Sequence, residues 1–308
     1  MQTGARSACQ LARDAAERLE CAGVPEPVAS AEVLLSELLG VRRSELALLE
    51  EPLTQEEEAL YEAWISRRSN REPVQRILGY AYFRNLRLEL DEHTLIPRPD
   101  TESVVDAVLE AIDRRAACGF EKTPTPDSRL PAPESEATCR VLDIGTGSGA
   151  IAISVAHERP SCDVHATDYS EDVLRIARRN LAWAGTRVRL HRAVLTSALE
   201  ALTGSVDVLV SNPPYVRSAD IAKLAPEVRD WDPHVALDGG PDGLDFYRRI
   251  FTEAVPLLAD GADVVLEVGD GQAGAVLELG WGAGYEPLGT RPDLTGVPRA
   301  VLLRWGLA

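Results

Sequence analysis

Cysteine is scarce in this chain of 308 residues, and it is scattered along the sequence. No two cysteines form a Cys-x-x-Cys pair; they are Cys9, Cys21, Cys118, Cys139 and Cys162. The histidines are equally dispersed, at His93, His157, His165, His191 and His234. Zinc sites and disulfide frameworks space their cysteines and histidines in short, regular patterns. The sequence therefore predicts no bound metal and no disulfide framework, and it favours a reducing compartment.

Long apolar runs are also lacking. The stretch Met1–Glu20 has no apolar core of the signal-peptide type, and no segment is long enough to span a bilayer. Positive charge is in deficit, because 32 Lys and Arg stand against 49 Asp and Glu, a formal net charge of −17. Proteins that bind the phosphate backbone usually present a basic surface, although a global charge can hide a local basic patch. The composition favours a cytoplasmic protein with no membrane contact and no direct nucleic-acid partner.

Residues 1–74 carry apolar residues at helical spacing: Leu11, Ala15, Leu19, then Val28, Ala31, Leu34, Leu35, Leu38 and Leu39. Ser44 and Thr54 precede acidic residues and are typical of helix N-caps, while Gly23 and Gly40 stand where helices would end. The segment holds no catalytic constellation. We predict a small helical bundle that serves as a scaffold or as a docking surface for a substrate.

Residues 75–95 change to a pattern of alternation, in which Leu86, Leu88 and Leu90 face one way. This pattern predicts a β-hairpin that links the bundle to a second domain at residues 96–308. Asp100 or Thr101 is expected to cap a helix that runs to about Arg115. Residues 118–138 are rich in proline, serine, threonine and charge, and predict a flexible surface loop without inferred chemistry.

Strands and helices alternate beyond that loop. We predict strands at 140–144, 163–167, 187–191, 206–211, 262–268 and 299–304, with a weaker one at 285–289. Helices fit at 149–158, 171–184, 244–258 and 271–280. Such alternation predicts an α/β fold with a mostly parallel seven-stranded sheet and helices on both faces, a Rossmann-like arrangement.

Asn212-Pro213-Pro214-Tyr215 follows the apolar strand at 206–211. Prolines stop the strand ladder and stiffen the chain, so Asn212 projects at the carboxyl edge of the sheet, where open α/β folds bind ligands. The amide oxygen of Asn212 can accept a hydrogen bond from a planar NH₂ group, and Tyr215 can cover the face of that group. An ordinary strand-to-turn transition is the alternative, because Asn and Pro are common turn formers.

Gly145-Thr146-Gly147-Ser148-Gly149 follows the strand at 140–144 and opens the next helix. Glycines allow a tight turn close to a ligand, and the helix N-terminus offers free N–H groups. Asp168 closes the following strand, at the place of a carboxylate that grips ribose hydroxyls. A merely tight turn and an acidic lead-in to the next helix are the alternatives for the loop and for Asp168. Asp143 is interpreted as a buried residue that steadies the glycines.

The glycine loop, Asp168 and Asn-Pro-Pro-Tyr together resemble a class I S-adenosylmethionine-dependent methyltransferase. The closer resemblance is to the release factor glutamine methyltransferase family, and it covers nearly the whole chain. It rests on the helical first domain, the hairpin and these segments: Leu95–Glu102 (Leu-Ile-Pro-Arg-Pro-Asp-Thr-Glu), Leu142–Ala152, Val210–Val216, Ala236–Gly240, Gly243–Asp245 with Tyr247, Leu266–Gly269 and Asp293–Gly296. Asn-Pro-Pro-Tyr is shared with adenine-N6 DNA methyltransferases, whereas the Pro-Arg-Pro-Asp-Thr-Glu segment makes the assignment specific.

This resemblance implies methyl transfer from S-adenosylmethionine to the side-chain amide nitrogen of the glutamine in the Gly-Gly-Gln motif of peptide chain release factors. It implies cofactor binding by Gly145, Thr146, Gly147, Ser148, Gly149, Asp168 and Asn212, and catalysis and substrate binding by Asn212, Pro213, Pro214 and Tyr215. Arg98 is expected to orient the substrate or to shield the cofactor, and Glu267 to support the pocket. The family usually has an aspartate near the cofactor adenine, but His191–Thr196 contains no carboxylate.

Two other functions stay open at this point. An adenine-N6 nucleic-acid methyltransferase would share the Asn-Pro-Pro-Tyr pocket, but it needs a basic channel and room for a flipped base. A non-catalytic cofactor-binding module is favoured by the missing aspartate and opposed by Asn212 and the intact glycine loop. Protein glutamine methylation is the function that the sequence favours.

Overall fold

The computed structural model describes residues 7–49, 51–117 and 139–306. The chain forms two compact units. One runs to Tyr80 and also contains Ala225–Trp231, and the other comprises Ala81–Leu224 and the chain from Asp232 onward. The predicted loop at 118–138 lies outside the described residues.

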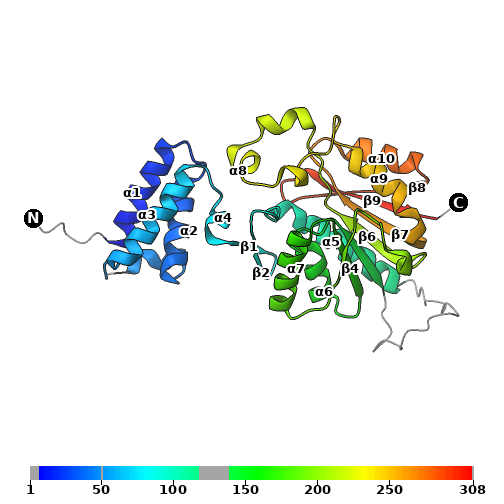
Figure 1. Ribbon diagram of the computed structural model, residues 1–308, viewed down its shortest axis with the longest axis horizontal. Coiled ribbons are helices and arrows are strands. Elements are labelled where there is room, and N and C mark those ends of the chain that lie inside the picture. Colours follow the sequence, from blue (N-terminus) through cyan, green and yellow to red (C-terminus); the bar gives the residue numbers. More distant parts are fainter. Residues whose placement is uncertain (1–6, 50, 118–138, 307–308) are drawn as a thin grey trace, which may run out of the picture. The chain divides into compact units, whose positions relative to one another are not determined.

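The first unit is a bundle of helices (Figure 1). Its elements are α1 (Ala8–Cys21), α2 (Pro27–Leu39), the 3-10 helix η1 (Arg43–Leu48), α3 (Gln55–Ser69), α4 (Val74–Leu78) and, from the distant segment, α8 (Pro226–Arg229). The apolar stripe packs into one core that includes Leu11, Leu19, Leu34, Leu35, Tyr61 and Ile65. Val28 is the exception, because its side chain is exposed.

The helix caps test the sequence pattern directly. Thr54 Oγ1 accepts a hydrogen bond from the Glu57 N–H at 3.2 Å, and the Glu57 carboxylate accepts one from the Thr54 N–H at 2.8 Å. This capping box confirms Thr54 as an N-cap. The prediction for Ser44 is wrong, because Ser44 lies inside η1, whose N-cap is Arg42. Glu45 satisfies that end by accepting a hydrogen bond from the Arg42 N–H at 2.9 Å.

A buried ion pair holds α8 within this unit. The Glu227 carboxylate accepts hydrogen bonds from Arg71 at 2.7 Å and from Arg68 Nη1 at 3.2 Å. Arg68 is 4% exposed and also donates to Ser30 Oγ at 3.2 Å. Burial alone would raise the pKa of Glu227, but its hydrogen bonds from Arg71 and Arg68 outweigh burial and lower that pKa.

The predicted hairpin begins later than the alternation suggested. Residues 74–78 form α4, whose Ile77 packs into the helical core, and the two strands are β1 (Tyr80–Phe83) and β2 (Leu86–Glu89). The helix expected after the hairpin is α5 (Glu102–Ala117). Neither Asp100 nor Thr101 caps it, because the 3-10 helix η2 (Pro99–Thr101) runs directly into α5.

Seven strands form the sheet of the second unit: β3 (Arg140–Ile144), β4 (Asp163–Asp168), β5 (Arg189–Arg192), β6 (Val206–Ser211), β7 (Leu258–Glu267), β8 (Tyr285–Pro292) and β9 (Pro298–Trp305). Their order is β5-β4-β3-β6-β7-β9-β8. The first five strands in this order pair in parallel, and β9 pairs antiparallel with both β7 and β8. The predicted mostly parallel seven-stranded sheet is confirmed.

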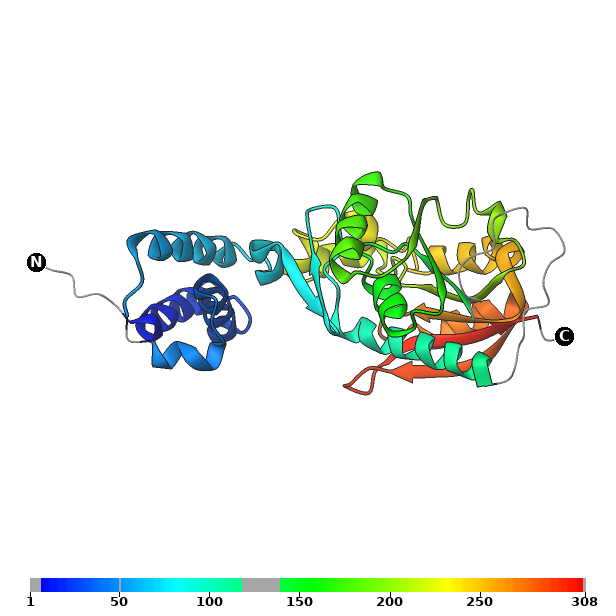
Figure 2. The same ribbon diagram turned by 90° about the horizontal axis from the view of Figure 1, so that it is seen from below.

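Helices cover both faces of this sheet (Figures 1 and 2). On one face, α5 and α6 (Ala150–Glu158) pack against Val141, Ala166 and Val208 of the sheet. Helix α7 (Glu171–Ala184) lies beside α6. The other face packs α9 (Asp245–Glu253) and α10 (Ala273–Gly282) against Leu142, Leu209 and Leu303. Short 3-10 helices complete the unit: η3 (Glu200–Leu202), η4 (Ser218–Lys223), η5 (His234–Ala236) and η6 (Val255–Leu257).

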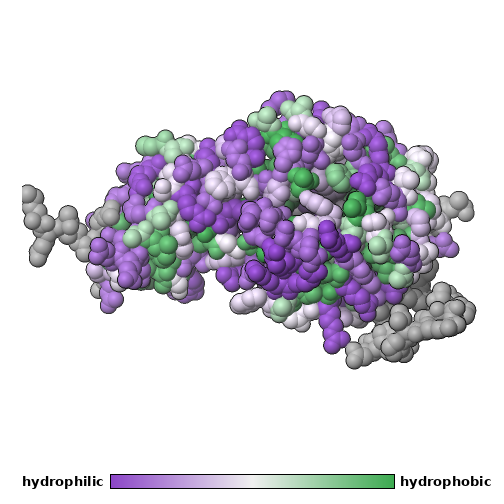
Figure 3. Space-filling view, in the orientation of Figure 1, coloured by the Kyte–Doolittle hydropathy of each residue, from purple (hydrophilic) through white to green (hydrophobic). Residues whose placement is uncertain are grey.

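The surface seen in Figure 3 is mostly hydrophilic, with hydrophobic residues interspersed. Within the described part of the chain, no helix combines the length and apolar character that a membrane span requires.

Candidate functional site

A cavity of about 390 Å³ opens in the second unit where β3, β4 and β6 end. Strand β3 lies between β4 and β6, so the connections from these strands leave the sheet in opposite directions at this point. Open α/β sheets bind their ligands at such a switch point. The predicted site residues that line the cavity are Arg98, Gly145, Thr146, Gly147, Ser148, Asp168, Asn212, Pro213 and Pro214.

The glycine loop lines the cavity, and its backbone lies beside the open space. Gly145 and Gly147 adopt positive φ of 72° and 59°. A Cβ atom at either position would meet nothing within 4 Å, so the left-handed backbone and the open cavity beside it explain these glycines. Gly149, the N-cap of α6, also has a positive φ of 87°, but it does not line the cavity, and a Cβ there would lie 2.7 Å from Ile153 Cδ1.

Asp168 ends β4 beside this loop. Its Oδ2 accepts a hydrogen bond from the Gly147 N–H at 3.2 Å, and its Oδ1 accepts one from the Ser170 N–H at 3.1 Å. Burial raises its pKa against the lowering effect of these hydrogen bonds. Ser170, rather than Asp168, is the N-cap of α7. Each carboxylate oxygen therefore keeps a lone pair for a ligand in the cavity.

Asp143 acts behind the loop and does not line the cavity. Its Oδ2 accepts a hydrogen bond of 2.6 Å from Thr146 Oγ1. Burial is the main cause that raises the pKa of Asp143 to about 7. The geometry agrees with the interpretation that Asp143 steadies the glycine loop.

The turn after β5 forms an apolar wall of the cavity through Ala193, Val194 and Leu195. The Val194 N–H donates to Ser197 Oγ at 2.9 Å, and the Leu195 carbonyl accepts a hydrogen bond from Thr167 Oγ1 at 3.2 Å. These bonds fix the turn in which the family resemblance expected an aspartate.

Asn212 leaves β6 at the edge of the cavity. Just before it, Ser211 Oγ donates a hydrogen bond of 2.7 Å to the Ile144 carbonyl and ties the end of β6 to β3. Asn212 Nδ2 donates to Thr101 Oγ1 at 3.4 Å. The amide nitrogen is thereby engaged by the protein, and its oxygen is left to accept from a ligand.

Over almost its full length the chain is similar to several release factor glutamine methyltransferases. The model of the PrmC N-terminal domain matches residues 10–79, and that of the methyltransferase small domain matches residues 128–227. The release factor glutamine methyltransferase of Streptomyces coelicolor is 39% identical, covering 95% of this chain and 96% of that protein. Those of Bradyrhizobium diazoefficiens and Agrobacterium fabrum are 40% and 36% identical, covering 95% and 94% of this chain and 93% and 94% of theirs.

The chain belongs to the release factor glutamine methyltransferase family. Membership explains why the helical unit and the methyltransferase unit occur together in one chain, as the two family models match one after the other along it.

Tyr215, the last residue of the Asn-Pro-Pro-Tyr segment, is not among the residues that line the cavity. A Cβ at Gly269 would lie 3.0 Å from Tyr215 Cδ2, so the ring packs against that glycine. Burial is the main cause that raises the pKa of its hydroxyl to about 12. The role of Tyr215 against the substrate amide stays a prediction.

The glycines after Asn-Pro-Pro-Tyr hold its backbone. A Cβ at Gly239 would lie 2.8 Å from both the Pro214 carbonyl oxygen and Tyr215 Cα. Val216 forms a parallel bridge with Asp238, in which the Val216 N–H donates to the Leu237 carbonyl at 2.9 Å and the Gly239 N–H donates back to the Val216 carbonyl at 2.8 Å. Residues 217–237 therefore form a long loop whose two ends are joined to each other by hydrogen bonds.

Arg98 lines the cavity from the Pro-Arg-Pro-Asp-Thr-Glu segment. Its Nη2 donates a hydrogen bond of 2.5 Å to Asp232 Oδ2. The Asp232 carboxylate is fully buried and the Arg98 side chain is 36% exposed, so the guanidinium is held at the rim of the cavity by a buried partner.

Sequence reasoning missed several lining residues, among them His93, Leu95, Thr101, Ile151, Tyr169, Phe246 and Arg249. Thr101 belongs to the Pro-Arg-Pro-Asp-Thr-Glu segment, which was a signal for its importance but not for its partner. Phe246 and Arg249 belong to α9, whose pattern of apolar residues predicts a helix without indicating which side chains reach the cavity.

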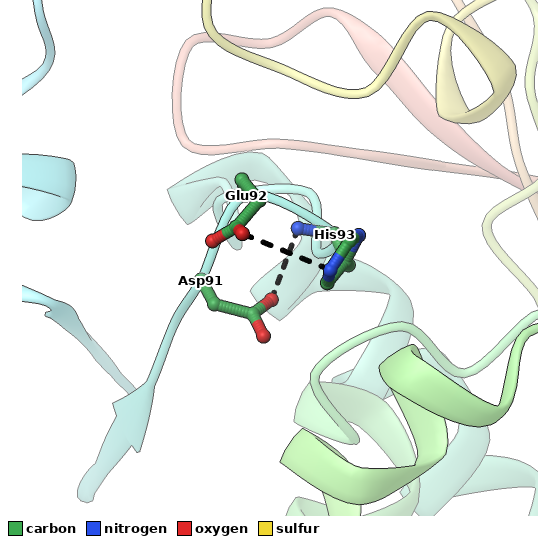
Figure 4. A group of neighbouring side chains, drawn as sticks. All are labelled: Asp91, Glu92 and His93. Carbon is green, nitrogen blue, oxygen red and sulfur yellow. Dashed lines mark hydrogen bonds and ion pairs between the residues drawn. The ribbon is translucent and has the colours of Figure 1, made fainter.

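Asp91, Glu92 and His93 bring three metal-binding groups within 4.8 Å of one another (Figure 4). The His93 N–H donates to Asp91 Oδ1 at 3.0 Å, and His93 Nε2 lies 3.8 Å from Glu92 Oε1. These contacts belong to a turn that Thr94 closes, since its N–H donates to the Asp91 carbonyl at 3.2 Å. The turn accounts for the group, and the absence of a bound metal stays a prediction.

Proposed function

We propose that this chain transfers the methyl group of S-adenosylmethionine to the side-chain amide nitrogen (N5) of the glutamine in the Gly-Gly-Gln motif of peptide chain release factors. The placement of Asn212 carries the proposal, because its amide nitrogen is bound to Thr101 and its oxygen is left for a planar NH₂ in a cavity beside the glycine loop. The names of the full-length relatives support this substrate.

The cavity fits the cofactor. Gly145 and Gly147 leave room where side chains would stand, Asp168 offers two acceptor oxygens for ribose hydroxyls, and Val194 and Leu195 give an apolar surface for the adenine. The bound cofactor supplies a methyl group already activated by a sulfonium. The chain's own residues then have to place the nitrogen and exclude water.

An amide nitrogen is a poor nucleophile because its lone pair is delocalised into the carbonyl. Asn212 Oδ1 and the Pro213 carbonyl are the acceptors that hold the NH₂ so that its lone pair faces the methyl group. Positive charge grows on the nitrogen during transfer, so these hydrogen bonds strengthen in the transition state. Alignment supplies the rest of the acceleration. No general base is assigned, because the proton can leave after transfer.

The helical unit is proposed to dock the release factor. This extends the prediction for residues 1–74, and the match of the PrmC N-terminal domain to residues 10–79 supports it. We also propose that the reaction takes place in the cytoplasm, where the release factors act.

The direct experiment incubates the purified chain with methyl-labelled S-adenosylmethionine and one of three substrates: a release factor, the same factor with its motif changed to Gly-Gly-Ala, or duplex DNA. Label on the unchanged release factor alone is expected. Label on DNA alone would support an adenine methyltransferase instead, and label on the Gly-Gly-Ala factor would show that another residue is modified. An Asn212→Ala variant should lose most turnover and leave cofactor binding nearly intact, because the glycine loop and Asp168 remain; equal loss of both would show that the role assigned to Asn212 is wrong.

A further inference from the structure

Three polar side chains gather at the wall of the cavity, each from a different element. Thr101 ends η2, Glu267 ends β7 and Asn212 follows β6. Thr101 and Glu267 are only 4% and 1% exposed. Glu267 does not line the cavity, whereas Thr101 and Asn212 do. A buried carboxyl with this position needs hydrogen-bond partners, and the proposed chemistry assigns it no task.

One hydrogen bond joins two of these side chains, and the carboxyl lies beside them. Asn212 Nδ2 donates to Thr101 Oγ1 at 3.4 Å. A hydroxyl that accepts one hydrogen bond can donate its own proton. Thr101 and Asn212 lie close enough to the Glu267 carboxyl to lower its pKa as donors, and Glu267 Oε2 is buried without a partner among the described residues. Glu267 is held in turn by Tyr247, whose Oη donates a hydrogen bond of 2.7 Å to the Glu267 carbonyl.

The surroundings tune the charge of this carboxyl. Burial raises the pKa of Glu267 to about 7, although the hydrogen bond from Thr101, the charge of Arg299 and the hydrogen bond from Asn212 each lower it. Asp100 is the nearby acid that raises it further. The Nη2 atom of Arg299 lies 3.0 Å from Asp100 Oδ2 and 3.1 Å from Asp293 Oδ2, so the positive charge of Arg299 is shared between two carboxylates.

We propose that Thr101 and Glu267 are positioning residues that fix the orientation of the Asn212 amide, with its NH₂ toward them and its oxygen toward the substrate. An amide group turned by 180° would present a donor to the substrate NH₂, and two donors cannot bind each other. An ionised carboxylate has acceptors only, so it selects the productive orientation. The inference rests on the proposed function, since a planar NH₂ is the group that Asn212 must accept.

A matched pair of variants tests the hydroxyl. Thr101→Val keeps the shape of the side chain and removes its hydrogen bonds, whereas Thr101→Ser keeps the hydroxyl. We expect Thr101→Val to lower kcat on the release factor by about tenfold or more, as for a lost hydrogen bond, with the Kd of the cofactor unchanged. Thr101→Ser should stay near the wild-type kcat. Equal kcat values for the two variants, or a Thr101→Val variant that loses cofactor binding to the same extent, would overturn the proposal.

The carboxyl is tested by its titration. The wild-type kcat should rise as pH increases through about 7, because the ionised carboxyl enforces the productive orientation. Glu267→Gln should remove this rise and lower kcat at pH 8. Among the described residues, the other titratable or charged groups that face Glu267 are Asp100, Tyr215, Tyr247 and Arg299, and the substitution changes none of them. A rise near pH 7 that persists in Glu267→Gln would contradict the role of this carboxyl.

A measurement without substrate separates this inference from the proposed function. The side-chain NH₂ resonances of Asn212, assigned by their loss in Asn212→Asp, should shift in Thr101→Val and stay close to wild type in Thr101→Ser. If this shift is seen while the wild-type chain labels no release factor, the orientation is supported and the proposed substrate is wrong. Unshifted resonances in Thr101→Val would show that Thr101 does not hold the amide.

Discussion

Gln272 Nε2 donates a hydrogen bond of 2.9 Å to the carbonyl oxygen of Tyr215. Its Oε1 accepts a hydrogen bond of 3.0 Å from the Gly269 N–H. One amide side chain thus joins the backbone after β6 to the backbone after β7. The position of Asn-Pro-Pro-Tyr therefore depends on a residue that does not line the cavity.

Gln272→Ala should weaken turnover more than cofactor binding. Loss of both hydrogen bonds leaves the Tyr215 carbonyl and the Gly269 N–H without this partner, at a cost of about 1–3 kcal/mol. The expected result is a lower kcat, a lower unfolding temperature and an unchanged Kd for S-adenosylmethionine, measured by calorimetry. Glu278→Ala, at an exposed position of the same helix, is the control and should match the wild type. An unchanged kcat in Gln272→Ala would contradict the bridging role.

Asp168→Ala should affect the cofactor rather than the chemical step. The two oxygens of Asp168 order the Gly147 and Ser170 N–H groups and are proposed to bind the ribose. We expect the Kd of S-adenosylmethionine to rise by about tenfold or more, with kcat recovered at saturating cofactor. Asp172→Ala, in the exposed first turn of α7, should leave the Kd unchanged. A kcat that does not recover at saturating cofactor would show that Asp168 has a further role.

Gly239→Ala should inactivate the enzyme without touching the cofactor. The new Cβ would lie 2.8 Å from the Pro214 carbonyl oxygen and 2.8 Å from Tyr215 Cα, so the backbone that carries Asn212 has to move. Misplacement of catalytic groups by about 1 Å can cost about a hundredfold in rate. Gly274→Ala is the matched control, because a Cβ there meets nothing within 4 Å and alanine favours a helix. Full activity of Gly239→Ala would show that the segment tolerates such a shift.

Glu227→Ala should loosen the helical unit. Its removal leaves Arg68 buried without its carboxylate partner, a change that costs about 3 kcal/mol or more in comparable buried pairs. Amide hydrogen exchange in α3 should accelerate, whereas removal of the exposed partner of Arg18 by Glu62→Ala should leave it unchanged. In the wild type, the lowered pKa of Glu227 means that this stabilisation is present above its unfolded value and is lost as pH falls through the folded pKa.

For strongly patterned elements, the sequence predicted the first and last residues correctly. The strands at 140–144 and 206–211 and the helix at 171–184 match β3, β6 and α7, because β-branched runs or amphipathic periods end there at clear turn signals. Strand β7 begins at Leu258, earlier than the predicted 262, since Asp260 and Gly261 look like a turn but continue the strand. The predicted helix at 244–258 ends at Glu253, and η6, which contains Pro256, follows.

The contents of the cavity were predictable only where a local signal exists. The glycine loop, Asp168 and Asn212 each stand at the end of a recognisable strand. The contact between Asn212 and Thr101 joins residues that are far apart in the sequence, and no local pattern encodes it. The same holds for Gln272, an ordinary helix-start residue until the fold brings it to the Tyr215 carbonyl.

The bridge between Val216 and Asp238 bears on which changes of loop length this chain can tolerate. Lengthening a loop whose ends are already joined costs little extra entropy, about 0.6 kcal/mol for a doubling of its length. Changes of length between residues 218 and 236 can therefore be tolerated where they keep Glu227, which binds Arg71, and Asp232, which binds Arg98. They also have to keep Val235 and Ala236, because these two residues line the cavity.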